Sequence, residues 1–109
     1  MIPNNVFVIN LDERPERLAE FHEKALAVGL EVKRWRAVSG EVVPWPSNWK
    51  SGNGAWGGYR SHMQIIEHCI QNRIGSCLIL EDDAVFSEHF LRDANDFFLN
   101  LPGDWQQAY

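Results

Sequence analysis

Three consecutive carboxylates, Glu81, Asp82 and Asp83, follow an apolar run and are the residues of this sequence best suited to chemistry. Their mutual repulsion costs stability unless a cation offsets it. If the extended backbone of the run continues through them, Glu81 and Asp83 project from one face and Asp82 projects from the other. Two carboxylates at this spacing suit Mg²⁺ or Mn²⁺, which also take phosphate oxygens and water as ligands. The alternative is that one carboxylate caps the next turn while the others are solvated.

Arginines are grouped at two places, where they could bind a small anion. Arg14 and Arg17 lie close together, and Arg34 and Arg36 follow Lys33 in a second group. For the first group the alternative is ion pairing on a helix surface. The acidic neighbours available for such pairs are Glu13, Glu16 and Glu20.

The elements that must position these residues alternate between strand and helix. The apolar run at residues 6–9 has polar residues on both sides, which predicts a strand buried on both faces. Asp12 as N-cap predicts a helix that ends at Gly29. Alternating charged and apolar residues at 32–38 predict a second strand. The continuous apolar run at residues 77–80 predicts a strand in the interior of a parallel sheet.

The second and third predicted strands are separated by a long loop and a helix. The loop covers residues 39–58 and is rich in tryptophan, glycine and proline. Helical spacing then predicts a helix from Tyr59 to about residues 72–75, and a further helix capped by Ser87. Residues 105–109 resemble the start of another strand. This alternation predicts an α/β fold, a three-layer sandwich with a mostly parallel sheet, whose ligand sites lie beyond the carboxyl ends of the strands.

Composition limits the class of protein. With 109 residues, 45% hydrophobic and 23% charged, the chain is expected to form one soluble globular domain, residues 1–109. A net charge of -5 argues against a nucleic-acid partner, which would need a broad basic surface. No leader peptide and no transmembrane segment are recognisable, so we expect a cytoplasmic protein. Cys69 and Cys77 match neither a zinc spacing nor a disulfide framework and are expected to be buried free thiols.

Four stretches in order resemble glycosyltransferase family 25, which contains lipopolysaccharide sugar transferases and collagen galactosyltransferases. Each motif is weak by itself, but the four together span most of the chain. They are residues 6–11 (Val-Phe-Val-Ile-Asn-Leu) with Arg14, Pro15 and Arg17; residues 34–40 (Arg-Trp-Arg-Ala-Val-Ser-Gly); residues 58–62 (Gly-Tyr-Arg-Ser-His); and residues 80–84 (Leu-Glu-Asp-Asp-Ala).

The resemblance implies the nucleotide-binding half of a GT-A glycosyltransferase, in which an acidic motif holds Mn²⁺ or Mg²⁺ against a nucleoside-diphosphate sugar. It makes Glu81 and Asp83 the metal ligands. It also implies contacts to the base or ribose at the end of the first strand, to phosphate at the arginines, and to the sugar or phosphate in the middle motif. The donor-contacting residues are then Asn10, Leu11, Arg14, Arg17, Ser61, His62 and Asp82.

Some of these residues have structural alternatives. Ser61 could satisfy the first turn of its helix instead, and His62 could be a buried structural histidine. The tryptophans of the loop at residues 39–58 could stack on a sugar or pin the loop to the rest of the fold.

The implied function is metal-dependent transfer of a hexose to a saccharide acceptor. In such enzymes the acceptor site and the usual catalytic base come after the acidic motif, and no base is assigned here. The alternative is therefore a donor- or metal-binding module that needs a partner or a C-terminal half. A homo-oligomer or a partner subunit would also complete an unfinished sheet. A metal-dependent phosphoesterase is a third class, but it would need more His and Asp ligands.

Overall fold

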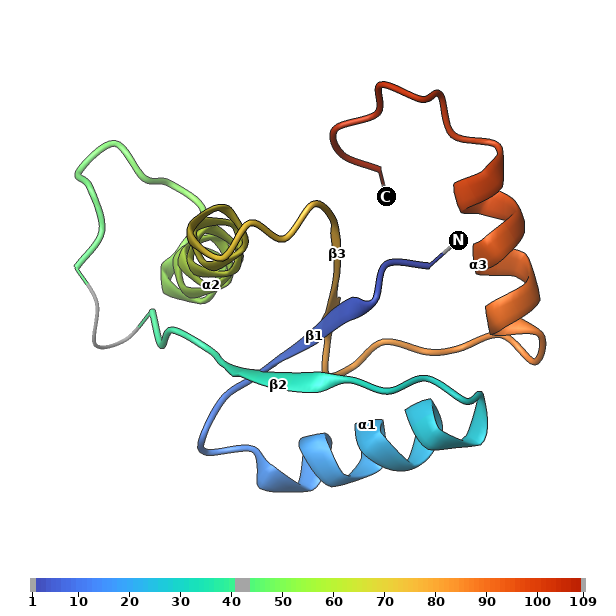
Figure 1. Cartoon of the computed structure of the whole chain (residues 1–109). Helices are drawn as coiled ribbons and strands as arrows, with labels where there is room; N and C mark the ends of the chain where they lie inside the picture. Colours follow the sequence, from blue (N-terminus) through green and yellow to red (C-terminus); the bar gives the residue numbers. More distant parts are fainter. Residues whose placement is uncertain (1, 41–43, 109) are drawn as a thin grey trace.

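Within the part of the chain that the structure describes, three strands and three helices alternate along the sequence (Figure 1). The structure, a computed structural model, describes residues 2–40 and 44–108. The elements are β1 (Asn5–Asn10), α1 (Pro15–Ala27), β2 (Lys33–Arg36), α2 (Asn53–Gln71), β3 (Cys77–Glu81) and α3 (Phe90–Leu99). None of the helices within these described ranges is long and apolar enough to cross a membrane.

β1 is the central strand of the sheet, whose order is β2-β1-β3. Both pairs are parallel, with Asn10 opposite Arg36 in β2 and Ile9 opposite Glu81 in β3. The carboxyl ends of all three strands therefore lie at one edge of the sheet.

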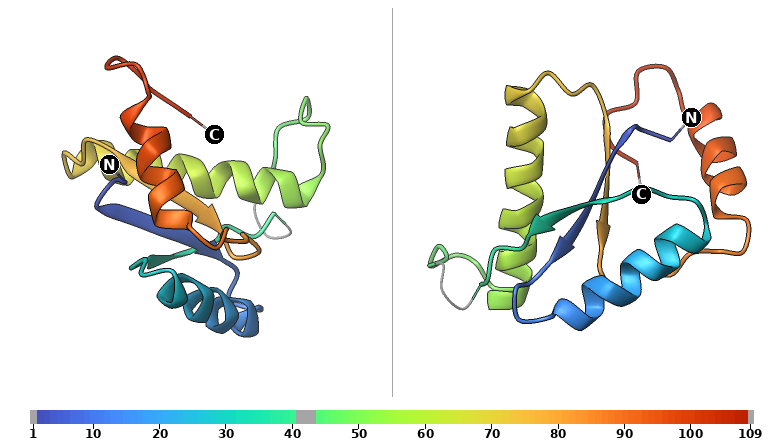
Figure 2. Two further views of the ribbon diagram at one scale, coloured as in Figure 1. Left: turned by 90° about the vertical axis from the view of Figure 1, so that its right-hand side faces the viewer. Right: turned by 60° about the horizontal axis from the view of Figure 1, so that its bottom comes forward.

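Helices cover both faces of the sheet and produce three layers (Figure 2). On one face Val6 and Val8 pack against α1 and α3, and on the other Phe7 and Ile9 pack against Ile65 of α2. Successive strand residues point to opposite faces, so β1 contributes to both apolar cores. Each fully buried side chain of this kind stabilises the fold by about 1.5–3 kcal/mol. The predicted three-layer α/β architecture with a parallel sheet is confirmed.

β3 is an outer strand of the described sheet, with β1 as its neighbour on one side. The prediction of an interior strand is therefore wrong. Its residues Cys77, Leu78, Ile79 and Leu80 are only half-buried. Leu78 and Leu80 face the core under α1 and α3, whereas Cys77 and Ile79 face the core under α2. The apolar run therefore reflects the helices on both faces, and it carries no information about which strands are neighbours.

α2 begins at Asn53, so the predicted loop over residues 39–58 is wrong at its last six residues. Gly54, Gly57 and Gly58 belong to the helix, and one of them has a packing role. A Cβ at Gly57 would collide with the carbonyl oxygen of Val38, so glycine lets the helix approach the preceding loop closely. Residues 41–43 of the predicted loop lie outside the described residues.

Three smaller predictions also fail. The N-cap of α1 is Arg14 and makes no side-chain cap bond, whereas Asp12 lies two residues earlier and pairs with arginines of β2. α3 begins at Phe90 rather than directly after Ser87. Residues 105–108 form no strand, and Tyr109 lies outside the described part of the chain.

Candidate functional site

The residues that could do chemistry gather at the carboxyl edge of the sheet. β1 ends in Asn10 and β2 in Arg36, while β3 ends in Glu81, which Asp82 and Asp83 follow. The first turns of α1 and α2 reach the same edge, where they line a hollow together with the acidic triplet. Residues far apart in sequence thus share one site.

Asn10 holds this edge together through a buried amide that is 2% exposed. Its Nδ2 donates to Asp82 Oδ2 at 2.8 Å and to the carbonyl oxygen of Arg14 at 2.9 Å. Its Oδ1 accepts from Arg34 Nε at 3.0 Å, and its carbonyl oxygen accepts from Arg34 Nη2 at 3.1 Å. Both amide hydrogens are used, so the side chain links β1, β2, the start of α1 and the acidic triplet.

Asp82 points inward, unlike its two neighbours. Its side chain is 12% exposed, and Oδ1 lies 3.7 Å from Nη1 of Arg17 while Oδ2 accepts from Asn10. Glu81 is 62% exposed, and Asp83 is exposed as well. Burial alternates as the sequence suggested, although the chain turns at residues 82–83 instead of continuing as a strand. Glu81 and Asp83 are therefore open to a ligand, and Asp82 is held by the protein.

Asp12 lies between two arginines of β2. Its Oδ1 is 2.7 Å from Arg34 Nη2, and its Oδ2 is 2.7 Å from Arg36 Nε. The hydrogen bond from Arg34, followed by the charge of Arg36, lowers the pKa of Asp12 below its ordinary value of 3.8. Because Arg34 also binds Asn10, these pairs fix the turn after β1.

A hollow of about 170 Å³, the small hollow, lies between the first turns of the helices and the acidic triplet. Arg17, Glu81 and Asp83 are among the residues that line it. Gly54 and Gly58 of α2 also line it, and a Cβ at either glycine would meet no atom within 4 Å. The bare helix backbone thus leaves room for a ligand, near a helix N-terminus that favours anions.

Ser61 and His62 are adjacent in α2 but differ in their surroundings. Ser61 is fully buried; its Oγ accepts from Val38 N at 2.8 Å and donates to the carbonyl oxygen of Gly57 at 2.8 Å. This hydroxyl therefore fastens α2 to the loop after β2. His62 is 43% exposed, so it is not the buried structural histidine of the alternative, and its Nε2 lies 3.9 Å from Glu81 Oε1.

The two remaining predicted donor contacts lie differently. Arg14 forms a 2.6 Å ion pair with Glu16, as the helix-surface alternative proposed, and this pair raises the pKa of Arg14 and lowers that of Glu16. Leu11 is 37% exposed and lines both the small hollow and a larger neighbour. Of these two side chains, Leu11 is the one placed to touch a ligand.

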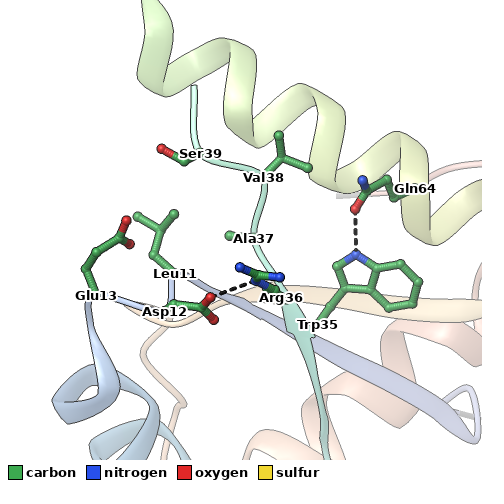
Figure 3. Close-up of a pocket in the computed structure, with 9 residues that line it drawn as sticks. All are labelled: Leu11, Asp12, Glu13, Trp35, Arg36, Ala37, Val38, Ser39 and Gln64. Carbon is green, nitrogen blue, oxygen red and sulfur yellow. Dashed lines mark hydrogen bonds and ion pairs between the residues drawn. The ribbon is translucent and has the colours of Figure 1, made fainter. Parts of the chain in front are cut away.

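The larger neighbour, the large hollow, has a volume of about 580 Å³ and opens beside β2 (Figure 3). Trp35 forms one wall, with its indole Nε1 donating to Gln64 Oε1 at 3.1 Å. Leu11, Ala37 and Val38 line both hollows, which are therefore adjacent. The lining residues are Leu11, Asp12, Glu13, Trp35, Arg36, Ala37, Val38, Ser39 and Gln64.

Tryptophans of the predicted loop pack on the start of α2. Trp49, Trp56 and Tyr59 have ring centroids 4.9–5.8 Å apart. The indole of Trp49 donates to the carbonyl oxygen of Gly52, and that of Trp56 donates to the carbonyl oxygen of Pro44. These contacts hold residues 44–52 against the helix. Of the two roles considered for the tryptophans, stacking on a sugar or pinning the loop, the structure shows the second.

Oxygen and nitrogen atoms that can bind a metal ion lie at the carboxyl edge of the sheet, but they do not enclose a site. Within the described residues, no group of three or more His, Cys, Asp and Glu side chains is arranged to hold a metal. Glu81 and Asp83 are exposed carboxylates on the small hollow. This fits Mg²⁺ or Mn²⁺, which bind through one or two carboxylates and complete their shell with phosphate and water.

Sequence reasoning did not predict the positions that several residues take at this site. Arg34 and Asp12 complete the Asn10 network. The alternation of charged and apolar residues at 32–38 was the signal in the sequence that Arg34 and Trp35 lie on opposite faces of the strand. Gly54 and Gly58, at the helical spacing of i and i+4, were hidden by the loop prediction.

Known proteins resemble this chain over most of its length. The sequence model of "Glycosyltransferase family 25 (LPS biosynthesis protein)" matches residues 3–107. A "Glycosyltransferase 25 family member" of Drosophila pseudoobscura pseudoobscura is 28% identical over 108 residues, in a match that covers 84% of this chain and 17% of the fly protein. The chain thus spans about a sixth of that relative's length. No solved structure matches the chain. The family match includes β1, the arginines of β2, the start of α2 and the acidic triplet, and this chain belongs to glycosyltransferase family 25.

Proposed function

We propose that this chain is the donor-binding part of a GT-A-type glycosyltransferase that binds a nucleoside-diphosphate sugar through Mn²⁺ or Mg²⁺, for hexosyl transfer to a saccharide acceptor. The observation that carries the proposal is the small hollow, whose lining combines carboxylates that can bind a cation with groups that can bind an anion. Glu81 and Asp83 line it together with Arg17 and with Gly54 and Gly58 of α2. A diphosphate bridged to carboxylates by a metal needs both kinds of group.

Each part of the site has a role in this proposal. Glu81 and Asp83 would hold the metal, which supplies charge neutralisation for the departing diphosphate. Asp82, held by Asn10 and Arg17, orients the turn that carries the two ligands. The missing side chains at Gly54 and Gly58 let the helix backbone approach the phosphates.

The nucleoside is expected in the large hollow, which adjoins the small one and is larger. Leu11 and Trp35 provide apolar contact for a base, and the charged and amide groups around them provide hydrogen bonds. Pockets for such ligands combine an apolar wall with a few polar groups. The order base, diphosphate, sugar then follows the carboxyl edge from β2 to β3.

Titration calorimetry of a nucleoside diphosphate against the chain, with Mn²⁺ and with EDTA, tests the metal bridge. We expect binding only with metal, because the diphosphate and the triplet repel each other otherwise. Glu81→Gln with Asp83→Asn should abolish the metal dependence. The matched control is Glu23→Gln with Asp96→Asn, which changes the net charge equally at exposed positions of α1 and α3. Equal affinity in EDTA would remove the metal from the proposal.

A donor-binding module without transfer activity is the second candidate. Among the described residues, three carboxylates line the small hollow, and all three have a role in the proposal, two at the metal and one in the Asn10 network. None of the described lining residues then remains as a base for an acceptor hydroxyl, which must lie within about 3 Å of it. Release of nucleoside diphosphate from a panel of donors, with and without saccharide acceptors, separates the candidates. Acceptor-dependent turnover would favour the enzyme, and acceptor-independent hydrolysis would favour the module.

A further inference from the structure

We infer that His62 binds the same divalent cation as Glu81, which makes the site one of mixed imidazole and carboxylate ligands that prefers Mn²⁺ to Mg²⁺. The inference rests on the proposed metal-dependent function and adds a ligand to it. It starts from the contact between α2 and the end of β3, where His62 and Glu81 face each other.

The separation of the two side chains suits a shared ion. His62 Nε2 lies 3.9 Å from Glu81 Oε1, which is too long for a direct hydrogen bond. Ligand atoms at about 2.1 Å from one ion are about 3.0 Å apart when adjacent in an octahedron and about 4.2 Å apart when opposite. The observed distance falls between these two values, so the two atoms are already at a separation that two ligands of one ion can have.

Both side chains can reach an ion from solvent, and the backbone that carries the imidazole is fixed. His62 is 43% exposed and Glu81 is 62% exposed. Ser61, the preceding residue, is bonded to both Val38 and Gly57, which holds this turn of α2 in place. An exposed ligand on a fixed backbone allows ion entry without loss of position.

The ligand types determine which ion is preferred. Mg²⁺ is bound almost entirely by oxygen and keeps several waters, whereas imidazole is a ligand for transition metals. With Glu81 alone or with Asp83, the site would accept either ion. With His62 as a further ligand, Mn²⁺ gains a nitrogen bond that Mg²⁺ does not exploit.

Electron–nuclear double resonance of Mn²⁺ bound to the 109-residue chain detects an imidazole nitrogen directly. We expect a nitrogen coupling in the wild type, its loss in His62→Gln, and a fall in Mn²⁺ affinity of about tenfold or more, since even groups that only orient a ligand cost that much. Mg²⁺ affinity should change far less. The control is His22→Asn, at the opposite edge of the sheet among Asn4, Val6 and Glu31, which should keep both coupling and affinity.

The outcomes distinguish this inference from the proposed metal-dependent function on which it rests. Mn²⁺ bound tightly with no nitrogen coupling in the wild type would overturn the role of His62 and leave the carboxylate site intact. No Mn²⁺ binding by the wild type, at any ratio of metal to protein and with nucleoside diphosphate present, would overturn both. Thermal unfolding of His62→Gln without metal checks for a folding defect, while the wild-type spectrum decides the inference by itself.

Discussion

Replacing Gly58 by alanine should stabilise the fold and weaken ligand binding. Gly58 lies inside α2, where alanine is favoured over glycine by about 0.5–1 kcal/mol, and its new Cβ would meet no atom within 4 Å. For a domain of this size we expect the melting temperature to rise by about 2–5 °C. The same methyl group enters the small hollow, whose volume is about 170 Å³. A methyl group is about the size of a water molecule, roughly 30 Å³, so it takes up roughly a sixth of that space.

The loss of binding should be about tenfold, or about 1.4 kcal/mol, because a phosphate can no longer lie against the helix backbone. Calorimetric titration with a nucleoside diphosphate and Mn²⁺ measures it, and a thermal melt measures stability on the same sample. A higher melting temperature together with weaker binding would show that this position serves ligand binding and not the packing of the fold.

Gly57→Ala is the matched control at the neighbouring position. Its Cβ would collide with the carbonyl oxygen of Val38 and lie 2.8 Å from the amide nitrogen of Gly40, so overpacking of about 1–3 kcal/mol should outweigh the gain in helix propensity. The protein should therefore melt at a lower temperature. A Gly58→Ala variant that is stabilised but binds as tightly as the wild type would refute the assignment of this helix face to the ligand.

Three further predictions concern single side chains of the core and the strand ends. Asn10→Ala should cost about 1–3 kcal/mol of unfolding free energy in urea, because it leaves the buried partners of the amide unpaired; a variant as stable as the wild type would contradict the network. Cys77 should react slowly with iodoacetamide at pH 8 in the native state, since burial, followed by its hydrogen bond with Cys69, raises the pKa of Cys77 to about 11; native alkylation as fast as in urea would argue against it. Asp12 has a lowered pKa, so the stability that its ion pairs contribute is present above its ordinary value of 3.8 and is lost as pH falls through the lowered pKa. Asp12→Asn should flatten that part of an acid unfolding curve, and an unchanged acid limb would count against the pairs.

Local pattern was enough to predict the three strands of the sheet and the presence of the helices between and after them. The β-branched run before Asn10 is a strand, and the apolar run before Glu81 is another, because alternate residues of each are covered by helices on opposite faces. The position of the acidic triplet at a strand end follows from the same pattern. Residue types and their spacing thus predicted the α/β class, the parallel sheet and the end of the sheet where a ligand would bind.

Local pattern failed at the glycines, because a glycine can belong either to a loop or to a helix. Glycines at 52, 54, 57 and 58 predicted a loop, yet three of them lie in α2. Glycine propensity is a weak local preference of about 1 kcal/mol, and contacts along the rest of the helix outweigh it. One of these glycines, Gly57, is required by close approach to Val38, a contact between segments that no local window contains.

What only the tertiary structure decided is which residues meet. Asn10 and Asp82 are 72 positions apart, and their 2.8 Å hydrogen bond exists because β1 and β3 are neighbours in register. The pairing of strands depends on the packing of all the layers at once, so the sequence of each strand does not reveal its neighbour. For the same reason the carboxylates could be assigned to an edge from sequence, whereas the approach of His62 to Glu81 depended on how α2 packs on the sheet.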